Sequence, residues 1–266
     1  MLSINTGPQS QRVEDSLWAW ESRQAKATLE LASGSSINSA ADNPAGLAVA
    51  MQLLGQATGD NQAIQNSQDG ISMLQTADGG LGQTQDLLQQ ARQLQVQSLN
   101  GTLTASDQQA INDQLQQINQ QIDQISGNTQ YNTQNLLDGT ANNVSLQTGA
   151  NPGQTTTVSL PNASSASLGV SGMTGNSATT LTAIDAAINQ VSSQRATIGA
   201  NINGLSATVN VQQAAMTNNL ASKSAISDTD MASAASALVQ SQIQSSSGIA
   251  MLAQTSNMNS GLVNLL

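Results

Sequence analysis

One stretch decides the fold of this chain: Ile184–Met216, with the sequence IDAAINQVSSQRATIGANINGLSATVNVQQAAM. Its repeat positions lie alternately four and three residues apart, and eight of the ten are apolar: Ile184, Ile188, Val191, Arg195, Ile198, Ile202, Leu205, Val209, Gln212 and Met216. Such a repeat keeps one stripe of a helix against a partner helix in left-handed coiled packing. The stretch predicts a helix roughly 50 Å long, which suits a rod better than a globule. Thr182-Ala-Ile-Asp185 has the form of a capping box, so we expect the helix to begin there.

The composition argues against an ordinary globular core. The chain of 266 residues contains no Phe, one Tyr and two Trp, so the large aromatic side chains that usually fill a globule are missing. Abundant Ala, Gln, Ser and Asn instead suit thin helices packed in pairs. Disorder is the competing interpretation, but a net charge of -10 is dilute over 266 residues and the apolar stripes give the chain something to bury. We expect order in the middle of the chain and leave disorder open for its two ends.

The missing residue types exclude most classes of enzyme. The chain has no Cys and no His, which removes thiol chemistry, the commonest metal ligand and the commonest acid-base catalyst. A metalloprotease motif of the form H-E-x-x-H is impossible for the same reason. We interpret the carboxylates on polar helix positions as caps or solvated faces: Asp107, Asp113, Asp123 and Asp185. The sequence predicts a protein that is not an enzyme and needs no cofactor or metal.

Charge and hydropathy also limit the partners. The six Lys and Arg residues are scattered along the chain, whereas nucleic-acid binding needs clustered cations, so we expect no nucleic-acid partner. No apolar run approaches the roughly 18 residues of a membrane span, so we expect no membrane insertion. The first eight residues, MLSINTGP, do not form a signal peptide. We expect either retention in the cytoplasm or export by a route that uses no cleavable leader.

Both ends of the chain carry weaker apolar stripes. Near the N-terminus the four-three spacing passes through Val13, Leu17, Trp20, Gln24, Ala27 and Leu31. A helix with so modest a stripe is marginal alone in water, so it becomes ordered on finding partners or packs as a terminal helix within a monomer. Near the C-terminus the apolar residues continue to the last position, through Met231, Leu238, Ile243, Ile249, Leu252 and Leu266. Soluble monomers more often end in polar residues, so this end predicts a partner elsewhere.

A long helical region is expected after the first helix. Asn43 and Pro44 mark its start, Leu47–Ala57 has a helical pattern, and Gly55 and Gly59 weaken the far end. An apolar stripe then continues through Ile64, Ile71, Leu74, Ala77, Leu81 and Leu88.

Another helix follows a turn at Asn100-Gly101. Ser106-Asp-Gln-Gln109 can cap its start, and its apolar stripe is the cleanest after the opening one: Ile111, Leu115, Ile118, Ile122 and Ile125. Beyond Gly127 the composition changes to Asn, Thr, Ser and Gly. Val144-Ser-Leu146 and Val158-Ser-Leu160 predict a small β-hairpin, and Pro161–Thr180 is expected to be a loop. The fold class is mainly α, with long antiparallel helices from the two halves of the chain in coiled-coil or rod packing and a small β-hairpin in the middle.

Local motifs at both ends of the chain match a known family. In the first half they are LASGSSINSAADNPAG at 31–46, DGISMLQTADG at 69–79, and QYN at 130–132 followed by Leu136-Leu137. In the second half they are RATIG at 195–199, NNL at 218–220 and ISDTDMA at 226–232. Together these motifs resemble the amino- and carboxy-terminal signatures of bacterial flagellin, in the right order and over most of the chain.

The resemblance implies a subunit that polymerises with copies of itself into the helical filament of a bacterial flagellum, which drives swimming. It implies that residues 1–42 and 223–266 pair as an inner coiled coil, disordered in the free subunit and ordered in the filament. Residues 43–180 would then form outer rod helices with the hairpin and loop, and residues 181–222 the returning rod helix. The stretch between Leu160 and Leu181 is too short for the variable outer domains of many flagellins, so this chain resembles a minimal flagellin.

The family also implies a cellular route and partners. Flagellins are secreted unfolded through the flagellar type III apparatus, which agrees with the missing leader, and they meet an export chaperone, hook-associated proteins and cap proteins. A hook-filament junction protein, which shares the terminal architecture, is the alternative function. A secreted helical translocator would also be long and leaderless, but it should carry a markedly apolar hairpin that this sequence lacks.

One departure from the family concerns the Toll-like receptor that senses flagellin. Recognised members carry an arginine and a glutamate where this chain has Gln90 and Gln114, whereas Arg92 and Leu94 are kept. We expect weak receptor recognition. The family also has basic residues at the positions of Ser36 and Ala41, so the salt bridges near that bend are in doubt.

Overall fold

A computed structural model describes residues 8–264 of the backbone and the side chains of residues 11–257. The chain divides into two compact units. Unit 1 comprises residues 1–55 and 218–266, and unit 2 comprises residues 56–217.

The described chain is mainly helical, as the sequence predicts. Its helices are α1 (Pro8–Ser33), α2 (Pro44–Ser98), α3 (Ala105–Asn128), α4 (Ala178–Ser227) and α5 (Met231–Asn264). Its strands are β1 (Gln130–Tyr131), β2 (Gln134–Asn135), β3 (Asn143–Gln147) and β4 (Thr155–Ser159). Helix α2 continues without a break past Gly55 and Gly59, where the sequence predicts a weak point.

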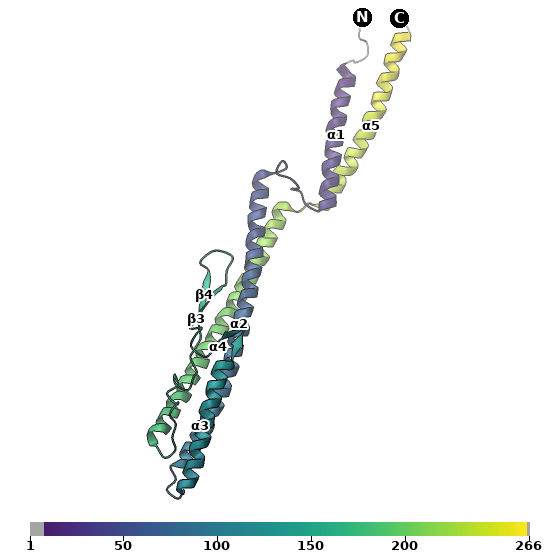
Figure 1. Ribbon diagram of the computed structural model, residues 1–266. Helices are drawn as coiled ribbons and strands as arrows, with labels where there is room; N and C mark the ends of the chain where they lie inside the picture. Colours follow the sequence, from purple (N-terminus) through teal and green to yellow (C-terminus); the bar gives the residue numbers. More distant parts are fainter. Residues whose placement is uncertain (1–7, 265–266) are drawn as a thin grey trace. The chain divides into compact units, whose positions relative to one another are not determined.

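In unit 1, helices α1 and α5 lie side by side and run antiparallel (Figure 1). The stripe of α1 that the heptad spacing predicts is buried or half-buried, with Ala27 only 4% exposed. Side chains of α1 pack against the backbone of α5 at Gly248, where an added Cβ would lie 2.6 Å from Cζ3 of Trp20 and 3.0 Å from Cδ2 of Leu17. The fully buried apolar residues described in this unit are all alanines: Ala27, Ala50 and Ala234. The larger apolar side chains of the pair, such as Leu17, Trp20 and Leu238, are only partly buried.

Backbone hydrogen bonds join the ends of α1 and α4. Ser36 N–H donates to the Ser227 carbonyl (2.7 Å), and Thr229 N–H donates to the Gly34 carbonyl (3.0 Å). Lys26 lies 3.6 Å from Asp42, so one ion pair forms near the bend even though Ser36 and Ala41 are uncharged. Helix α2 then begins as predicted at Pro44, with the Asn43 side chain accepting from Gly46 N–H at 2.8 Å.

Unit 2 holds the main hydrophobic core, built from the inner faces of α2, α3 and α4. The Leu, Ile and Val residues of these helices that are at most 1% exposed recur at heptad spacing: Leu74, Leu81 and Leu88 in α2, Leu115 and Ile122 in α3, and Ile184, Val191, Ile198 and Leu205 in α4. The predicted coiled packing of the opening stretch is therefore correct. Ion pairs between Arg195 and Asp78 (2.8 Å) and between Arg92 and Asp185 (2.6 Å) join α2 to α4 outside this core.

The predicted hairpin is present as β3 and β4, paired antiparallel with Val144 opposite Val158. It contacts both long helices, because the Asn66 amide donates to the Gln147 carbonyl (3.0 Å) and the Gln212 amide donates to the Thr148 carbonyl (3.0 Å). Gly70 of α2 leaves room for the hairpin, since a Cβ there would lie 2.3 Å from Cδ1 of Leu146.

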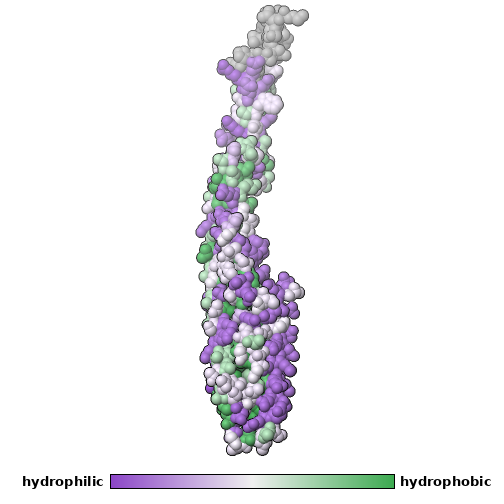
Figure 2. All heavy atoms as spheres, turned by 60° about the vertical axis from the view of Figure 1, so that its left-hand side comes forward, coloured by the Kyte–Doolittle hydropathy of each residue, from purple (hydrophilic) through white to green (hydrophobic). Residues whose placement is uncertain are grey.

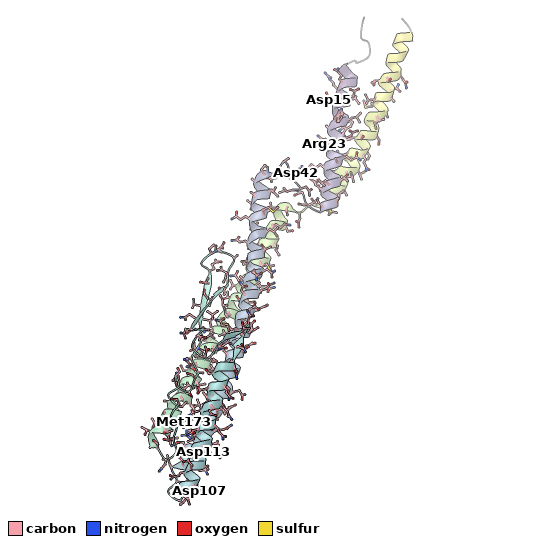
Figure 3. The ribbon with its side chains drawn as sticks, in the orientation of Figure 1. Asp15, Arg23, Asp42, Asp107, Asp113 and Met173 are labelled. Atoms are coloured by element: carbon pink, nitrogen blue, oxygen red, sulfur yellow. The ribbon has the colours of Figure 1, made fainter. Side chains whose placement is uncertain are left out.

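The stretch before α4 lacks regular structure but belongs to the core. Ala163, Leu168, Val170 and Met173 are each at most 4% exposed, and Figure 3 places Met173 beside the end of the unit that carries Asp107 and Asp113. Asp123 of α3 holds this stretch, accepting from Ser165 N–H (2.8 Å) and from its hydroxyl (2.9 Å). The loop that the sequence predicts is therefore packed against the helices.

Several local expectations were wrong. Helix α4 begins at Ala178, and the Thr182 hydroxyl donates to the Ala178 carbonyl inside the helix, so the box at Thr182-Asp185 does not cap it. The cap of α3 is Thr104, in a capping box with Asp107, in place of Ser106. A second small hairpin, β1–β2, turns through Asn132 and Thr133 at positive φ and was not expected.

Two carboxylates interpreted as simple caps or solvated faces, Asp123 and Asp185, instead make tertiary bonds to Ser165 and Arg92. Of the other two, Asp107 is a cap, and Asp113 accepts from the Gln109 amide at 2.9 Å.

Candidate functional site

The described residues offer surfaces for association and no chemical centre. Within residues 8–264 no group of three or more acidic side chains could hold a metal ion. None of the described helices is both long and apolar enough to cross a membrane. The features that call for an explanation are large apolar side chains that remain exposed on the surface of unit 1.

Helix α5 carries apolar side chains both where it packs on α1 and on the rest of its surface. The inner face lies toward α1, and its buried or half-buried positions are spaced three, four or seven residues apart: Ala234, Leu238, Ser241, Gly248 and Leu252. Around the rest of the helix, five apolar side chains are more than half exposed: Met231, Val239, Ile243, Ile249 and Met251. We call these five residues the outer face of α5.

A shallow hollow follows part of this outer face. It is lined by Ala235, Ser236, Val239, Gln240, Ile243 and Gln244. Ile243 is 61% exposed, although burying a side chain of this size is worth about 1.5–3 kcal/mol. The hollow offers small and apolar side chains to a partner, together with the polar side chains of Gln240 and Gln244.

Helix α1 carries a second exposed apolar surface. Trp18 is 74% exposed and Leu29 is 53% exposed. A shallow hollow beside Leu29 is lined by Glu21, Gln24, Ala25, Thr28, Leu29 and Ala32. Figure 2 shows green hydrophobic atoms gathered on the surface of the α1–α5 pair. Both helices of unit 1 thus have one face packed on each other and another open.

The structure separates the predicted terminal stripe into these faces. Val13, Leu17, Trp20 and Leu31 of α1 are half-buried, as are Leu238 and Leu252 of α5. Met231, Ile243 and Ile249 are more than half exposed and belong to the outer face, so their role in polymerisation stays a prediction. Leu266 lies outside the described residues.

The residues of the predicted rod stripe are brought together in the core of unit 2. Ile188 and Ile202 are half-buried and pack against this core. The other seven residues are at most 7% exposed: Ile111, Leu115, Ile118, Ile122, Val191, Ile198 and Leu205. Arg195 occupies a polar position in that stripe. Its Nε donates to Asp78 (2.8 Å) and its Nη1 donates to Gln85 (2.9 Å), and the hydrogen bond to Asp78 raises the pKa of the guanidinium.

The segment compared with receptor-binding flagellins lies on α2 and α3. Gln90, Arg92 and Gln114 are exposed, and Leu94 is half-buried against the core. The Nε atom of Arg92 donates to Asp185 at 2.6 Å, so this guanidinium already has a carboxylate partner within unit 2.

Sequence inspection missed Val239 and Met251 of the outer face and Trp18 and Leu29 of α1. The sequence does contain a pattern that points to two of these exposed residues, because Val239 and Ile243 lie four residues apart and therefore on the same side of a helix. Most other residues of α5 are Ala and Ser. The few large apolar residues of α5 are therefore easily read as one stripe, although some pack on α1 and others are exposed.

Two family models match the chain over most of its length. Residues 4–142 match the bacterial flagellin N-terminal helical region, and residues 181–266 match the bacterial flagellin C-terminal helical region. The two matches include the described parts of α1, α2, α3, α4 from Leu181 onward, and α5.

Similar proteins agree with these matches over most of their own lengths. The chain is 39% identical to a flagellin of Halalkalibacterium halodurans over 247 residues, covering 91% of each chain. It is 38% identical to a flagellin of Bacillus subtilis, covering 89% of this chain and 90% of the relative. It is 35% identical to a flagellar filament core protein of Brachyspira hyodysenteriae, with the same coverage.

A solved structure is also similar. The crystal structure of Bacillus cereus flagellin aligns with a TM-score of 0.50 and 30% sequence identity, covering 55% of this chain and 88% of that one. With both terminal helical regions matched and relatives aligned along nearly their whole lengths, this chain belongs to the bacterial flagellin family.

Proposed function

We propose that this chain is the structural subunit of a bacterial flagellar filament and that it assembles with copies of itself outside the cell. The observation that carries the proposal is the pair of open apolar surfaces on α1 and α5, whose inner faces already pack on each other. Copies that contact head to tail without closing a ring extend into a helical filament. The chain acts as a building element and not as an enzyme.

The driving force is burial of the outer face of α5 and the exposed surface of α1. The fully buried apolar residues described in unit 1 are only alanines, so the α1–α5 pair is weakly stabilised within one copy. Stacking of copies removes Ile243, Val239 and Leu29 from water, which offsets the entropy lost in ordering the helices. Assembly and ordering of the two ends are thereby coupled.

The same proposal covers the segments and the route of the chain. Residues 1–42 and 223–266 form the inner coiled coil, residues 43–180 the outer rod with its hairpin, and residues 181–222 the returning rod helix. The subunit leaves the cell unfolded through the flagellar type III apparatus, accompanied by a chaperone, and meets hook-associated and cap proteins at the filament ends. Its lack of Cys suits a chain that must be threaded without cross-links.

A seeded growth experiment tests the assembly surface. The double variant Val239→Ser with Ile243→Ser changes only exposed side chains, so the helicity of the monomer should stay unchanged. We expect it to raise the concentration of subunit left unassembled by at least about tenfold, because two apolar burials are lost. Filament fragments are incubated with purified subunit, and growth is measured by electron microscopy and sedimentation.

The matched control is Gln242→Ser, which changes an exposed residue of the same helix. It should grow like the parent. Normal elongation by the double variant would reject the outer face of α5 as an assembly surface.

We also propose that the flagellin-sensing Toll-like receptor recognises this chain weakly. Gln90 and Gln114 are exposed and uncharged, and the Arg92 guanidinium is engaged by Asp185, which supports the proposal. A receptor reporter assay with purified monomer should give a weak signal, and the double variant Gln90→Arg with Gln114→Glu should strengthen it. Full-strength signalling by the parent would contradict the proposal.

A further inference from the structure

The chain contains two Asn-Gly pairs that are similarly exposed to solvent but differ in backbone conformation. Asn100-Gly101 lies in the connection between α2 and α3, and Asn203-Gly204 lies inside α4. All four residues are exposed to solvent. The same two side chains are thus presented to water on an irregular backbone and on a helical one.

An Asn followed by Gly can modify itself. The backbone nitrogen of the Gly, once it loses its proton to hydroxide, can attack the Asn side-chain Cγ and close a five-membered ring. Glycine favours this step because it has no Cβ to block the approach and its backbone turns freely. The reaction requires that nitrogen to be free of hydrogen bonds and the chain around it to be able to rotate.

Asn100-Gly101 meets these conditions. The Asn100 side-chain oxygen accepts a hydrogen bond from Thr102 N–H at 3.3 Å, which closes a ring that contains both Cγ of Asn100 and the backbone nitrogen of Gly101. The side chain is therefore folded over the peptide unit that would attack it. Neighbouring backbone groups are paired, since Asn100 N–H donates to Gln97 and Leu103 N–H donates to the Asn100 carbonyl. Within the described chain, no hydrogen bond engages Gly101 N–H.

The space around Gly101 is also open. A Cβ built on it would have no heavy atom within 4 Å, and its φ does not lie in the left-handed region. The connection is short and follows the end of α2, where backbone motion concentrates. Figure 3 labels Asp107 on the first turn of the helix that follows this connection.

Asn203-Gly204 does not meet the conditions. Its backbone lies far from either end of α4, so Gly204 N–H is engaged by the carbonyl four residues earlier. Attack on Asn203 would require the helix to open locally, beside Leu205, which is only 1% exposed.

We propose that Asn100 is a site of spontaneous deamidation in the folded protein, with water as the co-reactant. The Gly101 nitrogen forms a bond to Cγ of Asn100, and the side-chain nitrogen leaves as ammonia with the proton it gains. Water then opens the cyclic imide at either carbonyl and yields aspartate or isoaspartate. One water is consumed and one ammonia is released, with no change in oxidation state.

The product differs from the parent in charge and in backbone length. Each modified copy gains one negative charge on a chain that already carries -10. The isoaspartate form also places the side-chain methylene in the main chain between α2 and α3. Copies of different age would therefore differ at this one connection.

The test compares the two pairs within one molecule. The purified full-length chain is incubated at mildly alkaline pH, and deamidation at Asn100 and Asn203 is quantified by peptide mass spectrometry. We expect Asn100 to react at least about tenfold faster, because Asn203 must first wait for local opening of α4. In urea, where both backbones are free, the two rates should converge.

A variant tests the attacking group. Gly101→Ala fits the open space and should slow the reaction at Asn100 while leaving the rate at Asn203 unchanged. Equal rates at the two sites in the folded chain would overturn the proposal, and so would an unchanged rate at Asn100 in the variant. The comparison of Asn100 with Asn203 in the parent chain decides the question even if the variant folds poorly.

Discussion

At the scale of single residues, four aspartates share one arrangement. Asp42, Asp107, Asp138 and Asp228 each accept a hydrogen bond from the hydroxyl of a Ser or Thr close in sequence: Ser39, Thr104, Thr140 and Ser224, respectively. These bonds favour the charged form, and each lowers the pKa of its carboxyl group below the ordinary value of 3.8. The aspartates lie where a helix or loop begins or ends, so they stabilise junctions.

The lowered pKa values predict the direction of acid sensitivity. A carboxyl group with a lower pKa in the folded chain stabilises it fully at pH values above 3.8, and this stabilisation is lost as the pH falls through the folded pKa. Asp107→Asn should therefore lower stability at neutral pH and reduce its loss below about pH 4. Urea unfolding followed by circular dichroism between pH 7 and pH 3 measures both effects. Equal slopes for the parent and for Asp107→Asn would contradict the prediction.

Caps were predictable from the sequence only where one candidate existed. Asn43 before Pro44 is unambiguous and caps α2. Thr104 and Ser106 both begin possible boxes, and the helix uses the earlier one. Helix α4 begins at Ala178, before its predicted box, and the preceding Ser177 carbonyl accepts from the Gln95 amide of α2 at 2.8 Å, a contact that local sequence does not reveal.

At the scale of elements, periodicity identified the helices of unit 2 because each buries a single stripe against the same core. For α5, periodicity did not separate the positions that pack on α1 from the five apolar residues that are more than half exposed. It also missed β1 and β2, since two-residue strands are too short to show alternation. Assembly surfaces are harder to predict than cores, because the residues that would pack against them lie on another copy of the chain.

Two glycines of α2 test the docking of the β3–β4 hairpin. Gly70→Ala should destabilise unit 2 by about 1–3 kcal/mol, because the added Cβ meets Leu146 at 2.3 Å and Leu205 at 3.3 Å. Gly79→Ala should stabilise the same helix by about 0.5–1 kcal/mol, since nothing lies within 4 Å of its Cβ. Denaturant unfolding of both variants measures the difference. Equal stabilities would mean that the hairpin is not seated on Gly70 in solution.

At the scale of the whole molecule, the two units differ in what they bury. Unit 2 encloses leucines and isoleucines from three helices, whereas the fully buried apolar residues described in unit 1 are alanines. Burial of a Leu or Ile side chain contributes far more than burial of an Ala. One chain thus combines a unit that has a large core of its own with one that, on our proposal, gains stability from other copies.

Hydrogen exchange should show this difference. In a dilute solution of full-length monomer, amides of α1 and α5 are expected to exchange much faster than those of α4 between Ile184 and Leu205, because the α1–α5 pair opens more easily. In assembled filaments the same amides should become protected. Equal protection of α1, α5 and the α4 segment in the monomer would remove the driving force proposed for assembly.

The packed stretch between β4 and α4 has a practical consequence for protein engineering. Foreign epitopes are usually grafted into segments that lack helix and strand. In this segment, however, Leu168, Val170 and Met173 are buried in the core. An antigenic peptide inserted there would split the hydrophobic centre. The exposed turn at Asn151–Gly153 of the β3–β4 hairpin is the better place to display cargo for a vaccine scaffold.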